Sequence, residues 1–165
     1  MKATELKALL EEFYRDKLAL KLRRIAAARL ISSYEVNNTY QYIINRDEVQ
    51  LGWLRNAIAE IAGELGDSRV TEPQLRAASV KGAAGERPVI TEDRDLTKQF
   101  VVRWRERVES VTNNRHRGML RVIIGESREQ ERFFDLALAG RGDLLGRRPD
   151  GMGTGGGVLS TRWME

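Results

Sequence analysis

Apolar residues recur every three or four positions along most of this chain, which is the spacing of one buried face of an α-helix. The first such stretch runs from Thr4, read as an N-cap, to about residue 31. Ser32 then precedes Glu35 by three residues, which is the spacing of a capping box. The pattern therefore predicts a second helix over residues 32–65, entered through a tight turn or a sharp kink.

The second half of the chain repeats this organisation. The acidic segment Thr91-Glu92-Asp93 predicts the start of a third helix. Residues 113–118 indicate a turn into a fourth helix that ends near Gly140. Between the second and third helices, residues 66–93 form a long connection, and Pro73 favours a short helix over about residues 72–80. A long link at this place is typical of a four-helix bundle with one crossover connection.

The last part of the chain differs from the bundle. We divide the sequence into a helical domain, residues 1–140, and a basic and glycine-rich tail, residues 141–165. Residues 151–157 have the composition of a flexible linker. The terminal segment beyond them carries Leu159, Arg162, Trp163 and Met164. Apolar anchors on a tether are typical of a docking peptide, so we expect this tail to bind a partner or its own bundle.

Composition narrows the class of protein. A chain of 165 residues is long enough for one domain with a single core. It has no cysteine, which excludes disulfides and thiolate metal ligands, and its net charge is +4. No run of about 18 apolar residues is present, so we expect no membrane partner. The N-terminus begins directly with an amphipathic pattern, and we expect a cytoplasmic protein.

Polar residues interrupt the apolar stripe on two of the predicted helices. Asp47 and Gln50 interrupt the second helix, and Ser127 and Gln130 interrupt the fourth. When these helices are aligned on their Ile-Ile pairs, Asp47 falls on Ser127 and Gln50 falls on Gln130. Both helices therefore carry the same interruption at the same height.

This arrangement resembles the ferritin-like superfamily over roughly residues 4–140. That family binds two metal ions, using a Glu from each of two helices and a Glu-x-x-His from each of the other two. The resemblance implies iron or manganese, with ligands drawn from Glu12, Asp16, Asp47, Gln50 and Gln130. Glutamine nevertheless stands at both histidine positions, a donor set ill suited to redox iron or manganese. The resemblance therefore implies an all-α, ferritin-like bundle whose di-metal site has decayed.

A second interpretation needs no metal. The interrupting residues can form a hydrogen-bonded polar layer, because a buried polar group left unpaired costs about 1–3 kcal/mol. Lys17 lies four residues after Phe13 and three before Leu20, so it falls on the buried face of the first helix. We expect it to supply the counter-charge to Asp47. The expected layer comprises Lys17, Asp47, Gln50, Ser127 and Gln130.

We therefore expect a non-catalytic structural or partner-binding subunit, without a cofactor, that self-associates or binds another protein. One alternative is a metal-binding oxidoreductase that uses iron or manganese. Another is a nucleic-acid-binding protein that uses the arginines around Trp104. Trp104 belongs to the apolar stripe and is expected in the core, which disfavours nucleic acid as a partner. The one histidine, His116, falls in a predicted turn and is expected at the surface.

Overall fold

A computed structural model describes residues 1–62, 64–76, 82–141 and 144 of the chain. These residues form four helices and no strand, so the predicted all-α architecture is confirmed. The helices are α1 (Ala3–Ala28), α2 (Tyr34–Ala62), α3 (Ala83–Glu109) and α4 (Asn114–Leu138).

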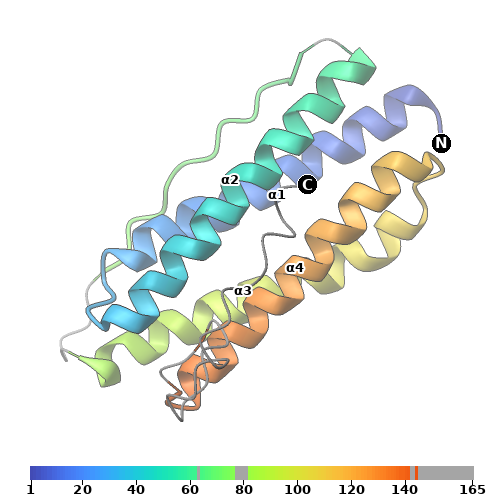
Figure 1. Cartoon of the computed structure of the whole chain (residues 1–165). Helices are drawn as coiled ribbons and strands as arrows, with labels where there is room; N and C mark the ends of the chain where they lie inside the picture. Colours follow the sequence, from blue (N-terminus) through green and yellow to red (C-terminus); the bar gives the residue numbers. More distant parts are fainter. Residues whose placement is uncertain (63, 77–81, 142–143, 145–165) are drawn as a thin grey trace, which may run out of the picture.

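The four helices form two antiparallel hairpins that pack side by side (Figure 1). Contacts are densest within each hairpin, between α1 and α2 and between α3 and α4. Across the bundle, α1 contacts α3 and α2 contacts α4. Because α2 and α3 run in the same direction, the chain between them must return along the bundle (Figure 1).

The described part of this connection, residues 64–76, has no helix. The short helix expected over residues 72–80 is therefore absent from residues 72–76, and residues 77–80 lie outside the described residues.

The break between α1 and α2 occurs at residues 29–33, so two separate helices form instead of one long helix. The carbonyl groups at the end of α1 are satisfied from α2. Asn37 Nδ2 donates to Ala28 O at 2.8 Å and to Ile31 O at 3.1 Å. This pairing joins the two helices of the first hairpin at the turn.

The sequence prediction for the start of α3 is wrong by about two turns. The helix begins at Ala83, after Gly82 with a φ of 79°, and continues through Pro88. Tertiary contacts hold these first turns in place, since Glu86 and Ile90 are 4% and 5% exposed. Burial of this segment outweighs the helix-breaking preference of Pro88, and the predicted cap at residues 91–93 lies inside the helix.

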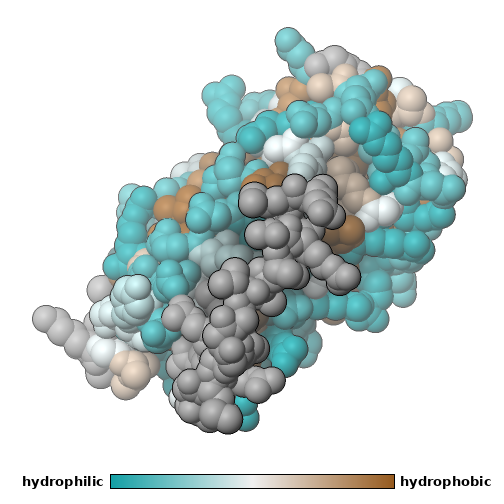
Figure 2. Space-filling model, in the orientation of Figure 1, coloured by the Kyte–Doolittle hydropathy of each residue, from teal (hydrophilic) through white to brown (hydrophobic). Residues whose placement is uncertain are grey.

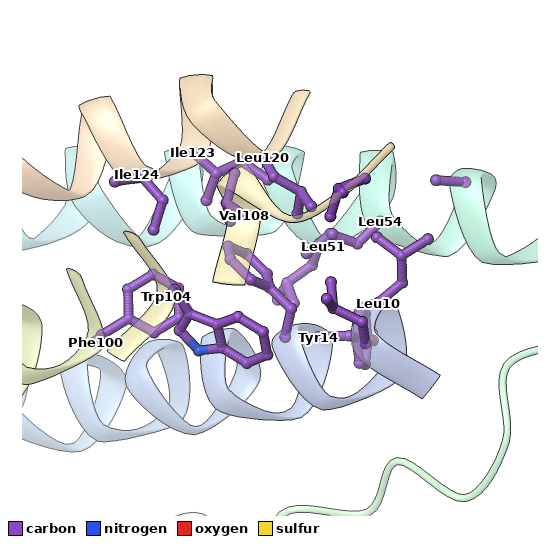
Figure 3. Packing of buried hydrophobic residues seen from close by; sticks show 14 of the residues in the cluster. Leu10, Tyr14, Leu51, Leu54, Phe100, Trp104, Val108, Leu120, Ile123 and Ile124 are labelled. Atoms are coloured by element: carbon purple, nitrogen blue, oxygen red, sulfur yellow. The ribbon is translucent and has the colours of Figure 1, made fainter. Parts of the chain in front are cut away.

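The interior contains two hydrophobic clusters. In the larger cluster, Phe13 packs edge-on against Trp104, with ring centroids 4.7 Å apart. Figure 3 shows Trp104 and Phe100 of this cluster among its aliphatic side chains. The smaller cluster lies towards the α1–α2 turn and includes Tyr40 and Phe134, with ring centroids 5.4 Å apart.

On every helix, two polar residues that are at most 2% exposed lie near the boundary between the larger and the smaller cluster. We call this set the polar layer; its members are Lys17 and Arg24 of α1, Asp47 and Gln50 of α2, Asp93 and Thr97 of α3, and Ser127 and Gln130 of α4.

Candidate functional site

Asp47 lies at the centre of the polar layer. Its side chain is fully buried, and so are its two cationic partners. Lys17 Nζ lies 2.7 Å from Asp47 Oδ1, the pairing expected from the sequence, while Arg24 Nη1 forms an ion pair with Oδ2. Gln130 Nε2 donates to Oδ1 at 3.3 Å. Both carboxylate oxygens therefore already have partners from the chain itself.

Arg24 also connects Asp47 to α3 through Thr97 and the backbone of Asp93. Its Nη2 donates to Thr97 Oγ1 at 2.9 Å, and that hydroxyl donates to the backbone carbonyl of Asp93 at 2.6 Å. The Asp93 side chain accepts from Tyr40 Oη at 2.5 Å and from Arg23 Nε at 3.2 Å. The layer thus joins α1, α2 and α3 through charged groups.

Each of the two glutamines bonds to a carboxylate on the other helix of the α2–α4 contact, Gln50 to Glu126 and Gln130 to Asp47. Gln50 Nε2 donates to Glu126, which also accepts from Arg46 Nη2 at 2.5 Å. The side-chain oxygens of Gln50 and Gln130 accept no hydrogen bond from any described residue. Ser127 is buried, but its hydroxyl donates to Ile123 O at 2.8 Å within its own helix. Ser127 is therefore in the layer by position, without bonding to the other predicted members.

The charges in and around the layer balance. Four cationic side chains form ion pairs with four carboxylates: Lys17, Arg23, Arg24 and Arg46 with Asp47, Glu92, Asp93 and Glu126. Lys17, Arg23, Arg24, Asp47 and Asp93 are buried, whereas the side chains of Arg46, Glu92 and Glu126 are 32%, 61% and 31% exposed. Buried charges are tolerated when opposite charges compensate them. No net charge is left in this set to attract a further ion.

Burial and charge pairing act in opposite directions on the titration of these groups. Burial lowers the pKa of Lys17 to about 8, against the opposing attraction of Asp47. Burial alone would raise the pKa of Asp47, but Arg24 and Lys17 outweigh it and hold that pKa below its usual value. At neutral pH the lysine and the carboxylate are therefore both charged. Burial raises the pKa of Asp93 despite its contacts with Tyr40 and Arg23.

The two α1 carboxylates expected as metal ligands face α3. Glu12 accepts from Arg107 Nη1 at 2.8 Å and from Arg103 Nη2 at 2.5 Å. The bond from Arg107, with that from Arg103, lowers the pKa of Glu12 to about 2. Asp16 accepts from Trp104 Nε1 at 2.8 Å. The structure therefore commits Glu12 and Asp16 to the α1–α3 contact and does not bring them to Asp47.

These residues do not fit a two-metal centre. Asp47 is the one carboxylate among the expected ligands that lies in the layer, and two cations are bound to it. Within the described ranges, no three His, Cys, Asp or Glu side chains come close enough to hold a metal ion. Amide oxygens beside an ammonium and a guanidinium group are a poor donor set for iron or manganese.

The arginines considered for nucleic-acid binding take part in ion pairs within the bundle. Arg103 and Arg107 bind Glu12, while Arg115 binds Glu60 and Arg121 binds Glu109. Trp104 is fully buried, as its place on the stripe predicts. The side chains of Arg103, Arg115 and Arg121 are nevertheless 52%, 78% and 55% exposed.

His116 is buried, contrary to the surface position expected for it. It is 7% exposed in the first turn of α4, and neither ring nitrogen bonds to a described residue.

Sequence reasoning missed three members of the layer, Arg24, Asp93 and Thr97. A signal for Arg24 was present, because it follows Leu20 by four residues just as Lys17 precedes Leu20 by three. Asp93 and Thr97 likewise lie seven and three residues before Phe100, on the same buried stripe. Asp93 was instead assigned to a helix cap, because α3 was expected to begin beside it.

The docking residues expected in the tail, Leu159, Arg162, Trp163 and Met164, lie outside the described residues. Among the described helices, none is both long enough and apolar enough to cross a bilayer.

Comparison of the chain with protein-family models, with curated proteins and with solved structures gives no match. Any function must therefore be argued from the residues of this chain.

Proposed function

We propose that this chain is a ferritin-like helical bundle in which an ion-paired polar layer stands where that family has its metal ions. In this proposal it is a non-catalytic structural or partner-binding subunit, and its tail is used for docking. The observation that carries the proposal is the state of Asp47, whose two carboxylate oxygens bind Lys17 and Arg24 in a fully buried position.

The layer has a structural use that does not depend on a metal. A helix that slid along its neighbour by one turn would bring a buried charge against an apolar cluster, which is strongly unfavourable. Asp47 can reach Lys17, Arg24 and Gln130 only in one alignment of α1, α2 and α4. The layer therefore supports a single register of the helices, which is the best-attested use of buried polar groups.

The metal-binding oxidoreductase is the alternative, and the geometry disfavours it. Iron or manganese at Asp47 would have to displace both Lys17 and Arg24. It would also have to recruit Glu12 or Asp16 from the arginines and the tryptophan of α3. Each step would leave a charge without its partner, in a layer where breaking one buried pair costs about 3–5 kcal/mol.

Metal analysis of the purified chain tests the bundle part of this proposal. After expression in medium supplemented with iron and manganese, we expect far less than one ion per chain. About two bound ions per chain, as in a di-metal centre, would overturn the proposal. Asp47→Asn is the control, because metal held at this layer would be lost from that variant.

Removal of the tail tests the docking part. We expect a chain ending at Asp150 to keep its helical content and to change its oligomeric state or its set of bound proteins. Light scattering and affinity capture from the same lysate would measure these two properties. An unchanged oligomeric state together with unchanged bound proteins would contradict docking of the tail on another chain or another protein.

A further inference from the structure

The outer surface of α2 and α4 carries exposed apolar side chains. Tyr42 and Val49 of α2 are 46% and 43% exposed, and Val122 of α4 is 50% exposed. Trp53 and Phe133, partly buried, flank them on the same two helices. Figure 2 shows apolar patches among hydrophilic residues on this side of the molecule. We call this surface, formed by Tyr42, Val49, Trp53, Val122 and Phe133, the α2–α4 face.

The α2–α4 face follows a second helical stripe beside the buried one. Tyr42, Val49 and Trp53 are separated by seven and four residues, so they share one side of α2. Across the seam, Tyr42 and Phe133 have ring centroids 6.2 Å apart, and Arg46 pairs with Glu126. The Arg46–Glu126 pair therefore crosses the face, with Tyr42 and Phe133 on one side of it and Val49, Trp53 and Val122 on the other.

The chain leaves α4 in a turn that sends it back towards the bundle. Gly140 has a φ of 76°, Arg141 N donates to Leu136 O, and Gly140 N donates to Ala137 O. These bonds form a Schellman motif, which ends the helix and reverses the chain. Leu144, four residues later, is only 3% exposed. Leu144 is therefore packed against the protein.

We propose that the terminal segment, residues 158–165, docks on the α2–α4 face of its own chain. Leu159, Trp163 and Met164 would contact Val49, Trp53 and Val122 in this arrangement. The proposal extends the proposed function, because it gives the tail a defined docking surface.

The length of the tail suits this placement. Val122 lies 16 residues before Leu138, which is about 24 Å along the helix at 1.5 Å per residue. A chain of 13 residues, the number from 145 to 157, would span about 20 Å on average if it behaved as a random coil, and about 43 Å if fully extended. The terminal segment thus reaches the middle of the face without strain.

Attachment to the same chain favours this segment over a second copy as the occupant. A short flexible linker gives a tethered peptide an effective concentration in the millimolar range, above that of a free second chain. Arg162, between the apolar anchors, also matches the exposed Glu129, which lies between Glu126 and Phe133 on the border of the face.

A nitroxide label on the full-length chain tests the docking directly. The chain has no cysteine, so Ser160→Cys provides one attachment site. We expect the methyl signals of Val49 and Val122 to lose at least half of their intensity in NMR spectra. Val102 of α3, which is 64% exposed and lies outside the face, serves as the internal control and should keep its intensity. Full intensity at Val49 and Val122 would overturn the proposal.

Two further samples make the result specific. In the labelled chain, Trp163→Ala with Met164→Ala should restore the Val49 and Val122 signals, whereas the matched variant Thr161→Ala with Glu165→Ala should not. A mixture of isotope-labelled chains without nitroxide and unlabelled chains with nitroxide reports contacts between copies. Loss of the Val49 signal in that mixture would assign the segment to a neighbouring copy and would also overturn the proposal.

Failure of this inference is distinguishable from failure of the proposed function. A chain without bound metal whose Val49 and Val122 signals keep full intensity would retain its non-catalytic bundle and lose only this docking surface. A chain with about two ions bound would lose the proposed function whatever the NMR result.

Discussion

A buried carboxylate such as Asp47 can act as a metal ligand or as one half of a structural ion pair. A carboxylate removed from water needs compensating charge, which a metal ion or a cationic side chain can equally supply. In this chain Lys17 and Arg24 supply it from the neighbouring helix. The two cations of α1 therefore determine whether Asp47 of α2 serves as a metal ligand or as the partner in an ion pair.

Asp47→Asn should be one of the most destabilising substitutions in the bundle. It leaves Lys17 and Arg24 buried together without their counter-charge, and we expect the free energy of unfolding to fall by about 3–5 kcal/mol. Denaturant titration followed by circular dichroism measures this loss. The matched control is Glu48→Gln, since Glu48 pairs with Lys21 and Arg55 at the surface. That change should cost less than about 1 kcal/mol, and equal costs would contradict the central role of Asp47.

Lys17 should make the free energy of unfolding depend on pH in the alkaline range. The folded chain releases the Lys17 proton at a pKa of about 8, whereas the unfolded chain holds it up to the ordinary value of 10.5. Between these values the unfolded state binds more protons, so the free energy of unfolding rises with pH. We expect a rise on the order of 2 kcal/mol between about pH 8 and about pH 10.

Denaturant titrations across this range measure that rise, and Lys17→Met should abolish it. A stability that is flat or falling over the same pH range in the unsubstituted chain would show that Lys17 titrates normally.

Periodicity predicts the positions of buried charges better than it predicts their partners. The spacing from Phe13 and Leu20 places Lys17 inside the bundle, and the pairing with Asp47 follows from the need for compensation. Periodicity could not predict which neighbouring helix the Glu12 side chain faces. It depends on which helix lies beside α1, and the sequence pattern does not state that Arg103 and Arg107 of α3 face it.

At the scale of elements, the entry into α2 is stabilised from a different helix than the sequence indicates. The Ser32–Glu35 spacing predicts a local capping box. The structure instead places Glu86 of α3 there, accepting from Ser32 N at 2.7 Å, Ser32 Oγ at 2.6 Å and Ser33 N at 3.1 Å. A carboxylate satisfies the free N–H groups of a helix start equally well from any element that reaches them.

Glu86→Gln should loosen the junction between α2 and α3. Burial raises the pKa of Glu86, but hydrogen bonds from Ser32 and Ser33 outweigh it and lower that pKa below its usual value. Loss of the charged acceptor should cost about 1–3 kcal/mol and speed amide exchange at residues 34–37. Hydrogen exchange read by NMR measures both effects.

Glu35→Gln is the control for the same helix start, and we expect it to cost less than about 1 kcal/mol. If Glu35→Gln were the more damaging change, the local capping box would be the correct description.

The ends of the helices show where local sequence signals suffice. The end of α4 at Gly140 and the turn at Asn113 are predicted well, because a positive φ and an Asn side-chain cap are local requirements. The start of α3 is predicted poorly, because burial of Glu86 and Ile90 against other elements holds it.

At the scale of the whole molecule, two helical hairpins are joined through a charged layer that divides two apolar clusters. The number of helices, the long connection and the height of the polar interruption on α2 and α4 are all readable from the sequence. The contribution of α3 to the layer is not, because Asp93 and Thr97 acquire their partners only when the hairpins pack. The ferritin-like relationship remains a prediction that the layer geometry motivates.

The central claim is that the layer is complete without a metal ion, and the response of thermal unfolding to metal tests it most directly. A ligand that binds only the folded state raises the unfolding midpoint, and the rise grows with the logarithm of the ligand concentration divided by its Kd. We predict the same midpoint with EDTA, with Mn²⁺ and, under anaerobic conditions, with Fe²⁺. The claim would be contradicted if the midpoint rose with Mn²⁺ or Fe²⁺, fell back with EDTA, and no longer responded to metal in Asp47→Asn.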